Sequence, residues 1–129
     1  MGRFEERRKE YAKALSRLEE ALKEKETEVT IDGVLHRFEF TFELAWKTMK
    51  DYLEYVGVID KTGSPREIIQ SAFQYGMIKE GEEWINMMLA RNSLSHLYDE
   101  EESRNVYQEI KSTYLKLLED LNQKLDETI

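Results

Sequence analysis

Apolar residues recur at steps of three, four and seven positions along most of this chain, and that period is typical of helices that bury one face. In the first segment the charged residues fall on the opposite face, and the pattern predicts a helix over about residues 3–26. The apolar positions there are Phe4, Tyr11, Leu15, Leu18 and Leu22. A matching stripe predicts the last helix and comprises Val106, Ile110, Tyr114, Leu117, Leu121 and Leu125. Such helices are stable when their apolar faces cover one another, so the chain is expected to form a bundle.

One segment is ambiguous over a short window. Apolar residues occupy every second position from 38 to 44, as they would in a half-buried strand. A longer window favours a helix, because the apolar positions from Phe38 to Val56 keep the helical period for five turns and Gly57 then supplies a stop. We therefore predict one long helix from about Asp32 to Val56.

A capping motif marks the start of a short helix in the middle of the chain. Ser64 is a good N-cap, Pro65 follows at the first helical position, and Glu67 completes the pattern of a capping box. Gly76 is then placed to end this helix. The motif predicts a helix near residues 65–76 that crosses over or covers the longer ones.

Asp99 and Glu102 form a second capping motif ahead of the last helix. Helical spacing predicts another helix over residues 82–97.

The sequence has no internal repeat and no long linker. The economical architecture is therefore all-α, an up-and-down bundle of four long helices plus one short helix. We predict a single domain over residues 1–129. Two Trp, seven Tyr and five Phe exceed the needs of one small core and favour a helical homodimer.

Charge and composition narrow the classes of function. With 19 basic and 27 acidic residues, the net charge of −8 repels a polyanion at long range, so any nucleic-acid site must be local. The absence of cysteine excludes disulfides, thiolate chemistry and Cys-based zinc sites. The sequence has neither a membrane-spanning apolar run nor an obvious export signal. We expect a cytoplasmic protein with no membrane contact.

Two histidines are the candidates for proton transfer. His36 falls near the start of the predicted second helix, where a solvated or capping role is common. His96 differs, because the apolar stripe of Ile85 and Leu89 continues at helical steps into Asn92 and His96, so the core-facing side turns polar. We expect a polar group that projects toward the bundle or a partner, comprising Arg91, Asn92, Ser95, His96 and Tyr98.

An arginine, a histidine and a tyrosine grouped in this way suit an anionic ligand. Arg91 would bind and neutralise a phosphate, and His96 could move a proton to or from a ribose hydroxyl or a leaving oxygen, with no metal or other cofactor. The alternative is a buried polar network in which Arg91 and His96 fix helix packing or a dimer seam, while Asn92 and Ser95 satisfy carbonyls at the helix end. Spacing alone favours this structural alternative.

The same residues carry a family resemblance. The segment from Arg91 to Tyr98 (RNSLSHLY) matches the R-x4-H-x-Y signature of HEPN-domain proteins. The aromatic segment from Phe38 to Thr48 (FEFTFELAWKT), together with Ser64-Pro65-Arg66, is similar to the nucleotidyltransferase substrate-binding, HepT-like branch. The resemblance spans nearly the whole chain and implies an all-helical, up-and-down bundle that dimerises.

The resemblance also implies a function. HepT-like toxins belong to toxin–antitoxin pairs and are encoded beside a minimal nucleotidyltransferase with which they form a complex. Arg91 and His96 match the metal-independent ribonuclease site of these toxins, which lies close to the dimer seam and acts on RNA. Tyr98 matches the tyrosine that the partner adenylylates to silence the toxin. A nucleotide on Tyr98 would add phosphate charge and bulk beside Arg91.

Two other functions stay open. The chain is a non-catalytic substrate-binding subunit of a two-component nucleotidyltransferase if the same cleft holds a nucleotide or docks the transferase and His96 only orders the site. It is a structural protein if Arg91 and His96 form a packing network in a helical dimer. The negative net charge disfavours a ribonuclease, because such an enzyme must attract RNA.

Overall fold

The computed structural model describes residues 2–58, 63–97 and 99–128, and within those ranges the chain is built from helices without a strand. The elements are α1 (Gly2–Leu22), α2 (Glu28–Tyr55), α3 (Pro65–Tyr75), α4 (Gly81–Ser93), α5 (Glu100–Glu109) and α6 (Leu115–Thr128). A five-residue π-helical segment, Ile110–Tyr114, joins α5 to α6 into one long element. The predicted all-α bundle of four long helices plus one short helix is confirmed, whereas the homodimer stays a prediction.

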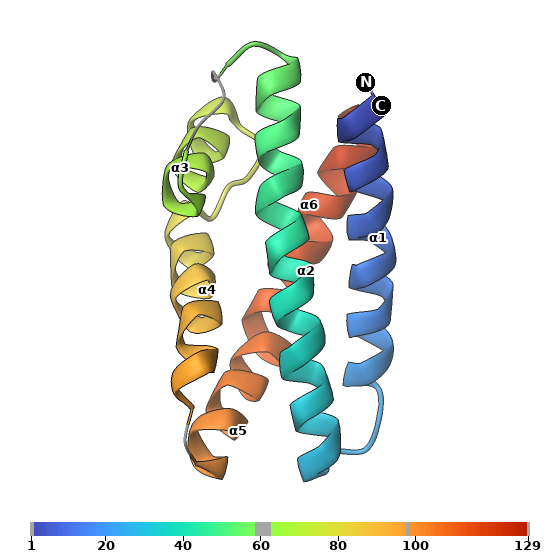
Figure 1. The fold of residues 1–129 in the computed structure, drawn as a ribbon, viewed down its shortest axis with the longest axis vertical. Coiled ribbons are helices and arrows are strands. Elements are labelled where there is room, and N and C mark those ends of the chain that lie inside the picture. The colour runs from blue at the N-terminus through green and yellow to red at the C-terminus, as the bar shows by residue number, and fades with distance from the viewer. Residues whose placement is uncertain (1, 59–62, 98, 129) are drawn as a thin grey trace.

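The helices alternate in direction. Figure 1 shows α1 and α2 side by side and antiparallel, with α3 and α4 stacked along the other flank of α2. The element made of α5 and α6 crosses behind them at an angle, and α6 brings the end of the chain back beside the start of α1. Two flanks of α2 are therefore occupied, by α1 on one side and by α3 and α4 on the other.

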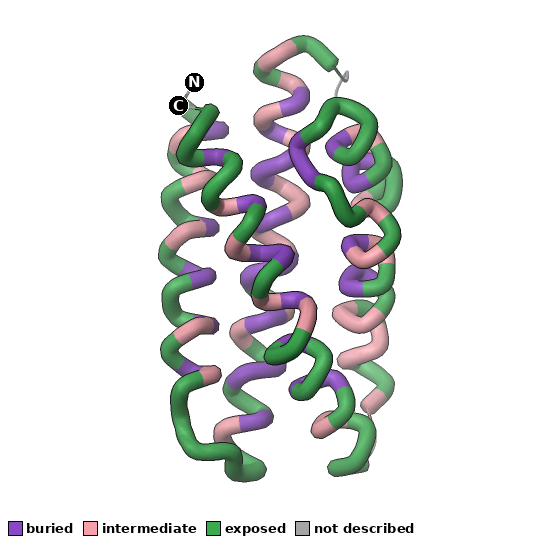
Figure 2. The backbone as a smooth tube through the Cα atoms, turned by 180° about the vertical axis from the view of Figure 1, so that it is seen from behind, coloured by how far each residue is buried: buried purple, intermediate pink, exposed green. Residues whose placement is uncertain are grey.

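The core lies around α2. Eleven residues of this helix are buried, more than in any other described helix, and they include Phe38, Phe42 and Met49. Figure 2 shows that the buried positions of each helix face inward and form one continuous interior. The predicted stripe of the last helix is buried at all six positions, from Val106 to Leu125. Burial of these apolar faces is the main source of stability in a bundle of this size.

Both predicted capping motifs are confirmed. The Ser64 hydroxyl accepts from the Glu67 N–H, and the Glu67 carboxylate accepts from the Ser64 N–H, which completes the capping box of α3. Gly76 ends α3 in the left-handed conformation, at φ 96°. The Asp99 carboxylate accepts from the Glu102 N–H at 2.7 Å and caps α5.

Two predicted helix boundaries are wrong, and the last helix contains an irregular segment. The first helix ends at Leu22 rather than near residue 26, and the second begins at Glu28 rather than Asp32, because the Thr27 hydroxyl accepts from the Thr30 N–H and caps α2. The last helix is not a uniform α-helix, since the Leu115 N–H bonds to the Ile110 carbonyl, five residues back. This wider turn changes the phase of the helix and keeps the apolar stripe on the core side.

A pair of carboxyl groups makes the contact between α1 and α6 sensitive to pH. A hydrogen bond with Glu19 on α1, followed by burial and the charge of Glu19, raises the pKa of Glu119 on α6 to about 7. The folded chain then holds a proton that the unfolded chain, with a carboxyl pKa of 4.5, releases. This contribution to stability is fully present below pH 4.5 and is lost as the pH rises through about 7.

Glu119→Gln, which mimics the protonated side chain, is expected to stabilise the protein at about pH 8 by about 1 kcal/mol and to have little effect near pH 4. Urea unfolding at both pH values measures the two free energies. Glu20→Gln, at an exposed position of α1, controls for the loss of one negative charge. An equal effect of Glu119→Gln at both pH values would contradict the pairing of the carboxyl groups.

Candidate functional site

The predicted site residues follow the end of α4. Trp84, Met87 and Met88 are buried and fix this helix against the bundle. The α-helix ends at Ser93, earlier than the predicted residue 97, and a single 3-10 turn from Leu94 to His96 continues it. A 3-10 turn advances by three residues instead of 3.6, so α-helical spacing no longer predicts which way Ser95 and His96 point.

The face that carries Asn92 and His96 is not the core face of this chain. Leu89 is 49% exposed, and Asn92, Ser95 and His96 are exposed as well. The expected continuation of a core stripe through Leu89 is therefore wrong, because the buried side of α4 is already formed by Trp84, Met87 and Met88. Projection toward a partner stays a prediction. His96 is exposed in the single chain, so a ligand in solution can reach the imidazole. A packing role of Arg91 and His96 at a dimer seam stays a prediction.

Arg91 is half-buried where α4 faces α2. Its Nη2 lies 3.3 Å from Oε1 of Glu43 and 3.9 Å from Oε2 of Glu39, and both carboxylates belong to α2. Its Nε is buried without a hydrogen-bond partner among the described residues. The Arg91 side chain as a whole is 29% exposed, so an anion can approach it.

Glu43 is the residue of this site that the sequence analysis missed. It accepts a hydrogen bond of 3.0 Å from the Trp46 indole and lies 3.7 Å from the Lys47 ammonium, in addition to its contact with Arg91. The spacing of Glu43 and Trp46, three residues apart on one helix, was available as a signal. The contact between Glu43 and Arg91 could not be predicted from the sequence, because it depends on the register of α2 against α4.

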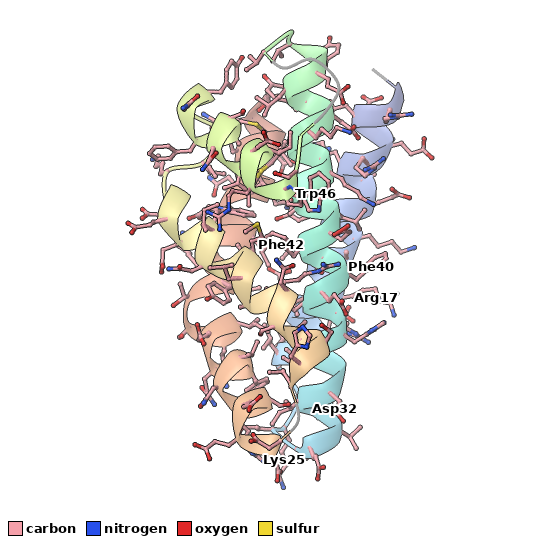
Figure 3. All side chains as sticks on the ribbon, turned by 60° about the vertical axis from the view of Figure 1, so that its left-hand side comes forward. Arg17, Lys25, Asp32, Phe40, Phe42 and Trp46 are labelled. Carbon is pink, nitrogen blue, oxygen red and sulfur yellow. The ribbon has the colours of Figure 1, made fainter. Side chains whose placement is uncertain are left out.

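The aromatic residues of α2 divide between the interior and the surface. Figure 3 shows Phe42 inside the bundle and Phe40 at its outer edge, in agreement with exposed fractions of 1% and 58%. Trp84 is buried, and Trp46 is partly buried against the core. His36 is exposed on α2, which agrees with the expected solvated role.

Acidic side chains surround the end of α4. A hollow of about 210 Å³ next to it has Leu97 and Ser103 in its lining together with four carboxylates, from Glu28, Asp32, Asp99 and Glu100. Glu39 and Glu43 add two more beside Arg91. An RNA strand would meet mostly negative charge here, so its binding must depend on local contacts with Arg91.

Tyr98 lies outside the residues that the structure describes. Over the described ranges, His, Asp and Glu side chains form no group of three that could hold a metal ion. Nor does any helix within those ranges have the length and apolar character needed to cross a membrane.

The comparison with known proteins identifies the family. A family model described as "Nucleotidyltransferase substrate binding protein like" matches residues 6–127. The chain belongs to this family. It is also 33% identical over 100 residues to a protein named "Probable ribonuclease HepT" from Haemophilus influenzae, an alignment that covers 73% of this chain and 68% of that protein. The resemblance to the HEPN superfamily and its HepT-like branch is thereby confirmed.

Two solved structures of high similarity have the same fold. One is HI0074 from Haemophilus influenzae, described as having the fold of a substrate-binding domain of a nucleotidyltransferase. It superposes with a TM-score of 0.80 at 25% identity, and the match covers 92% of this chain and 98% of that one. A protein from Thermus thermophilus superposes with a TM-score of 0.81 at 28% identity, and the match covers 89% of this chain and 98% of that one. Family membership extends over nearly all of the bundle, including the α4 end that carries Arg91 and His96.

Proposed function

We propose that this chain is a HepT-like, metal-independent ribonuclease, the toxin of a toxin–antitoxin pair, with Arg91 and His96 as its catalytic residues. The observation that carries the proposal is the exposure of His96 three residues beyond the end of α4, on the element that also presents the half-buried guanidinium of Arg91. The relative named a probable ribonuclease supports the reaction class.

The reaction needs only a proton-transfer group and a cation. The ribose 2′-oxygen attacks the adjacent phosphorus as its hydroxyl loses a proton, and the leaving 5′-oxygen gains one. His96 either takes the first proton, while water supplies the second, or supplies the second, while water takes the first. As the bond from phosphorus to O5′ breaks, a 2′,3′-cyclic phosphate and a 5′-hydroxyl form. Arg91 neutralises the charge that grows on the non-bridging phosphate oxygens. Asn92 and Ser95, exposed on the same segment, supply supporting hydrogen bonds to the substrate.

Cleavage of RNA in the presence of EDTA tests the proposal. His96→Ala and Arg91→Ala should each lower the rate by about 100-fold or more, since each removes a group that acts in the transition state. His36→Ala is the matched control, because His36 is the other histidine and is also exposed. Substitution of the exposed His96 should change the free energy of unfolding by less than about 0.5 kcal/mol. A folded His96→Ala variant that cleaves RNA at the wild-type rate would exclude this mechanism.

The ribonuclease would be regulated by modification of Tyr98. A minimal nucleotidyltransferase encoded nearby adenylylates this tyrosine in the cytoplasm, and the added phosphate competes with RNA for Arg91. Tyr98 follows His96 by two positions in the chain, so the modification is attached next to the catalytic residues in sequence. Two copies of the chain form a homodimer whose seam lies close to the site.

Intact mass after co-expression with the partner nucleotidyltransferase measures this modification. We expect added mass in increments of one adenylate, which Tyr98→Phe abolishes because it removes the accepting hydroxyl. Tyr55→Phe serves as the control, since Tyr55 is a tyrosine with 57% of its surface exposed. Unmodified protein in a stable complex with the transferase would contradict adenylylation.

That last outcome would favour the second candidate, a non-catalytic substrate-binding subunit of a two-component nucleotidyltransferase. The acidic surroundings of the site support this second function, since Glu39 and Glu43 lie beside Arg91 and four carboxylates line the hollow at the end of α4. HI0074, the structural relative from Haemophilus influenzae, is described as a domain of this kind. In this role the cleft holds a nucleotide or docks the transferase, and His96 transfers no proton.

A further inference from the structure

Glu43 contacts several side chains around Arg91 but has no role in the proposed reaction. Its Oε1 accepts a hydrogen bond of 3.0 Å from the Trp46 indole and lies 3.3 Å from Nη2 of Arg91. Its Oε2 lies 3.7 Å from Nζ of Lys47. The carboxylate therefore connects a partly buried aromatic side chain of α2 to the arginine of α4.

Trp46 makes this carboxylate a fixed group rather than a mobile surface charge. The indole packs against the core cluster, so its N–H has a defined direction, and the carboxylate that accepts from it is held in one place. Glu39, one turn earlier on α2, provides the contrast. It is 46% exposed, against 32% for Glu43, and its carboxylate lies farther from Nη2, at 3.9 Å.

We infer that Glu43 is a positioning residue that holds the Arg91 guanidinium in the orientation required to bind a phosphate, with Trp46 fixing Glu43 in turn. An arginine side chain that is partly exposed loses rotamer freedom only when a neighbour fixes it. The ion pair with Glu43 is made through Nη2 of Arg91, at 3.3 Å, so the nearer carboxylate holds one terminal nitrogen of the guanidinium. This inference rests on the proposed ribonuclease function for its kinetic consequence, but not for the orientation of Arg91.

The contact between Glu43 and Arg91 also has an alternative interpretation, in which Glu43 competes with phosphate for Arg91 and inhibits the site. The two readings predict opposite changes in kcat when the charge of Glu43 is removed. A positioning residue raises kcat, since it keeps the guanidinium aligned in the transition state. A competitor lowers kcat or raises KM, because the arginine must leave it before binding RNA.

The kinetic experiment compares two neutralised carboxylates of α2. Glu43→Gln keeps the size of the side chain and an acceptor for Trp46 but removes the charge that holds Arg91, and we expect kcat to fall about tenfold while KM stays constant or falls. Glu39→Gln is the matched control, with a change in kcat of less than about twofold. Trp46→Phe should lower kcat by about threefold, because the carboxylate is no longer fixed. An unchanged or increased kcat in Glu43→Gln would overturn the inference.

A second measurement does not depend on cleavage of RNA. The buried Nε–H of Arg91 can be followed by NMR, and its resonance can be assigned by comparison with Arg91→Lys. We expect its hydrogen exchange to accelerate at least about fivefold in Glu43→Gln and to stay at the wild-type rate in Glu39→Gln, since release of the guanidinium exposes Nε to water. Equal exchange in all three proteins would overturn the inference. If wild-type protein cleaves no RNA but the exchange rates differ as expected, the ribonuclease proposal fails and the orienting role of Glu43 stands.

Discussion

The buried side of α2 holds this bundle together. Its apolar side supplies the largest share of the core, and α1, α3, α4, α5 and α6 all pack against it. At the junction with α1, the Thr41 hydroxyl donates to the Ala14 carbonyl and the Arg37 guanidinium donates to the Arg17 carbonyl, so the two longest helices are also joined by polar contacts. A helix fixed on several sides can hold its outward side chains in a defined place.

The candidate site depends on that fixation. Arg91 and His96 belong to one short segment, yet their surroundings differ, because Arg91 meets carboxylates of α2 while His96 extends into solvent beyond the last α-helical turn. The negative charge around them weakens attraction of RNA over long distances. Under the proposed function, binding of RNA therefore depends on the local contact between Arg91 and a substrate phosphate.

Features that depend on neighbouring residues could be predicted from the sequence. The capping box at Ser64, the cap at Asp99 and the stripe of the last helix follow from local spacing, and the structure has all three. Features that depend on which side chains become buried when the helices pack could not be predicted from the sequence. The α-helical projection from Leu89 to His96 failed because other residues of α4 took the buried side and a 3-10 turn changed the spacing. Arg91 and His96 were predicted as site residues from their chemical type and stay a proposal, whereas the contact of Arg91 with Glu43 could be seen only once the packing of two helices was known.

In the proposed reaction, the α4 end cleaves RNA through the ribose 2′-hydroxyl. The most direct test first maps the bond that the purified protein cuts and then compares that RNA with one that carries a single 2′-deoxynucleotide on the 5′ side of this bond. We expect the unmodified bond to be cut to a 2′,3′-cyclic phosphate and a 5′-hydroxyl and the modified bond to stay intact. Cutting of the modified bond, or no cleavage of the unmodified RNA, would contradict it.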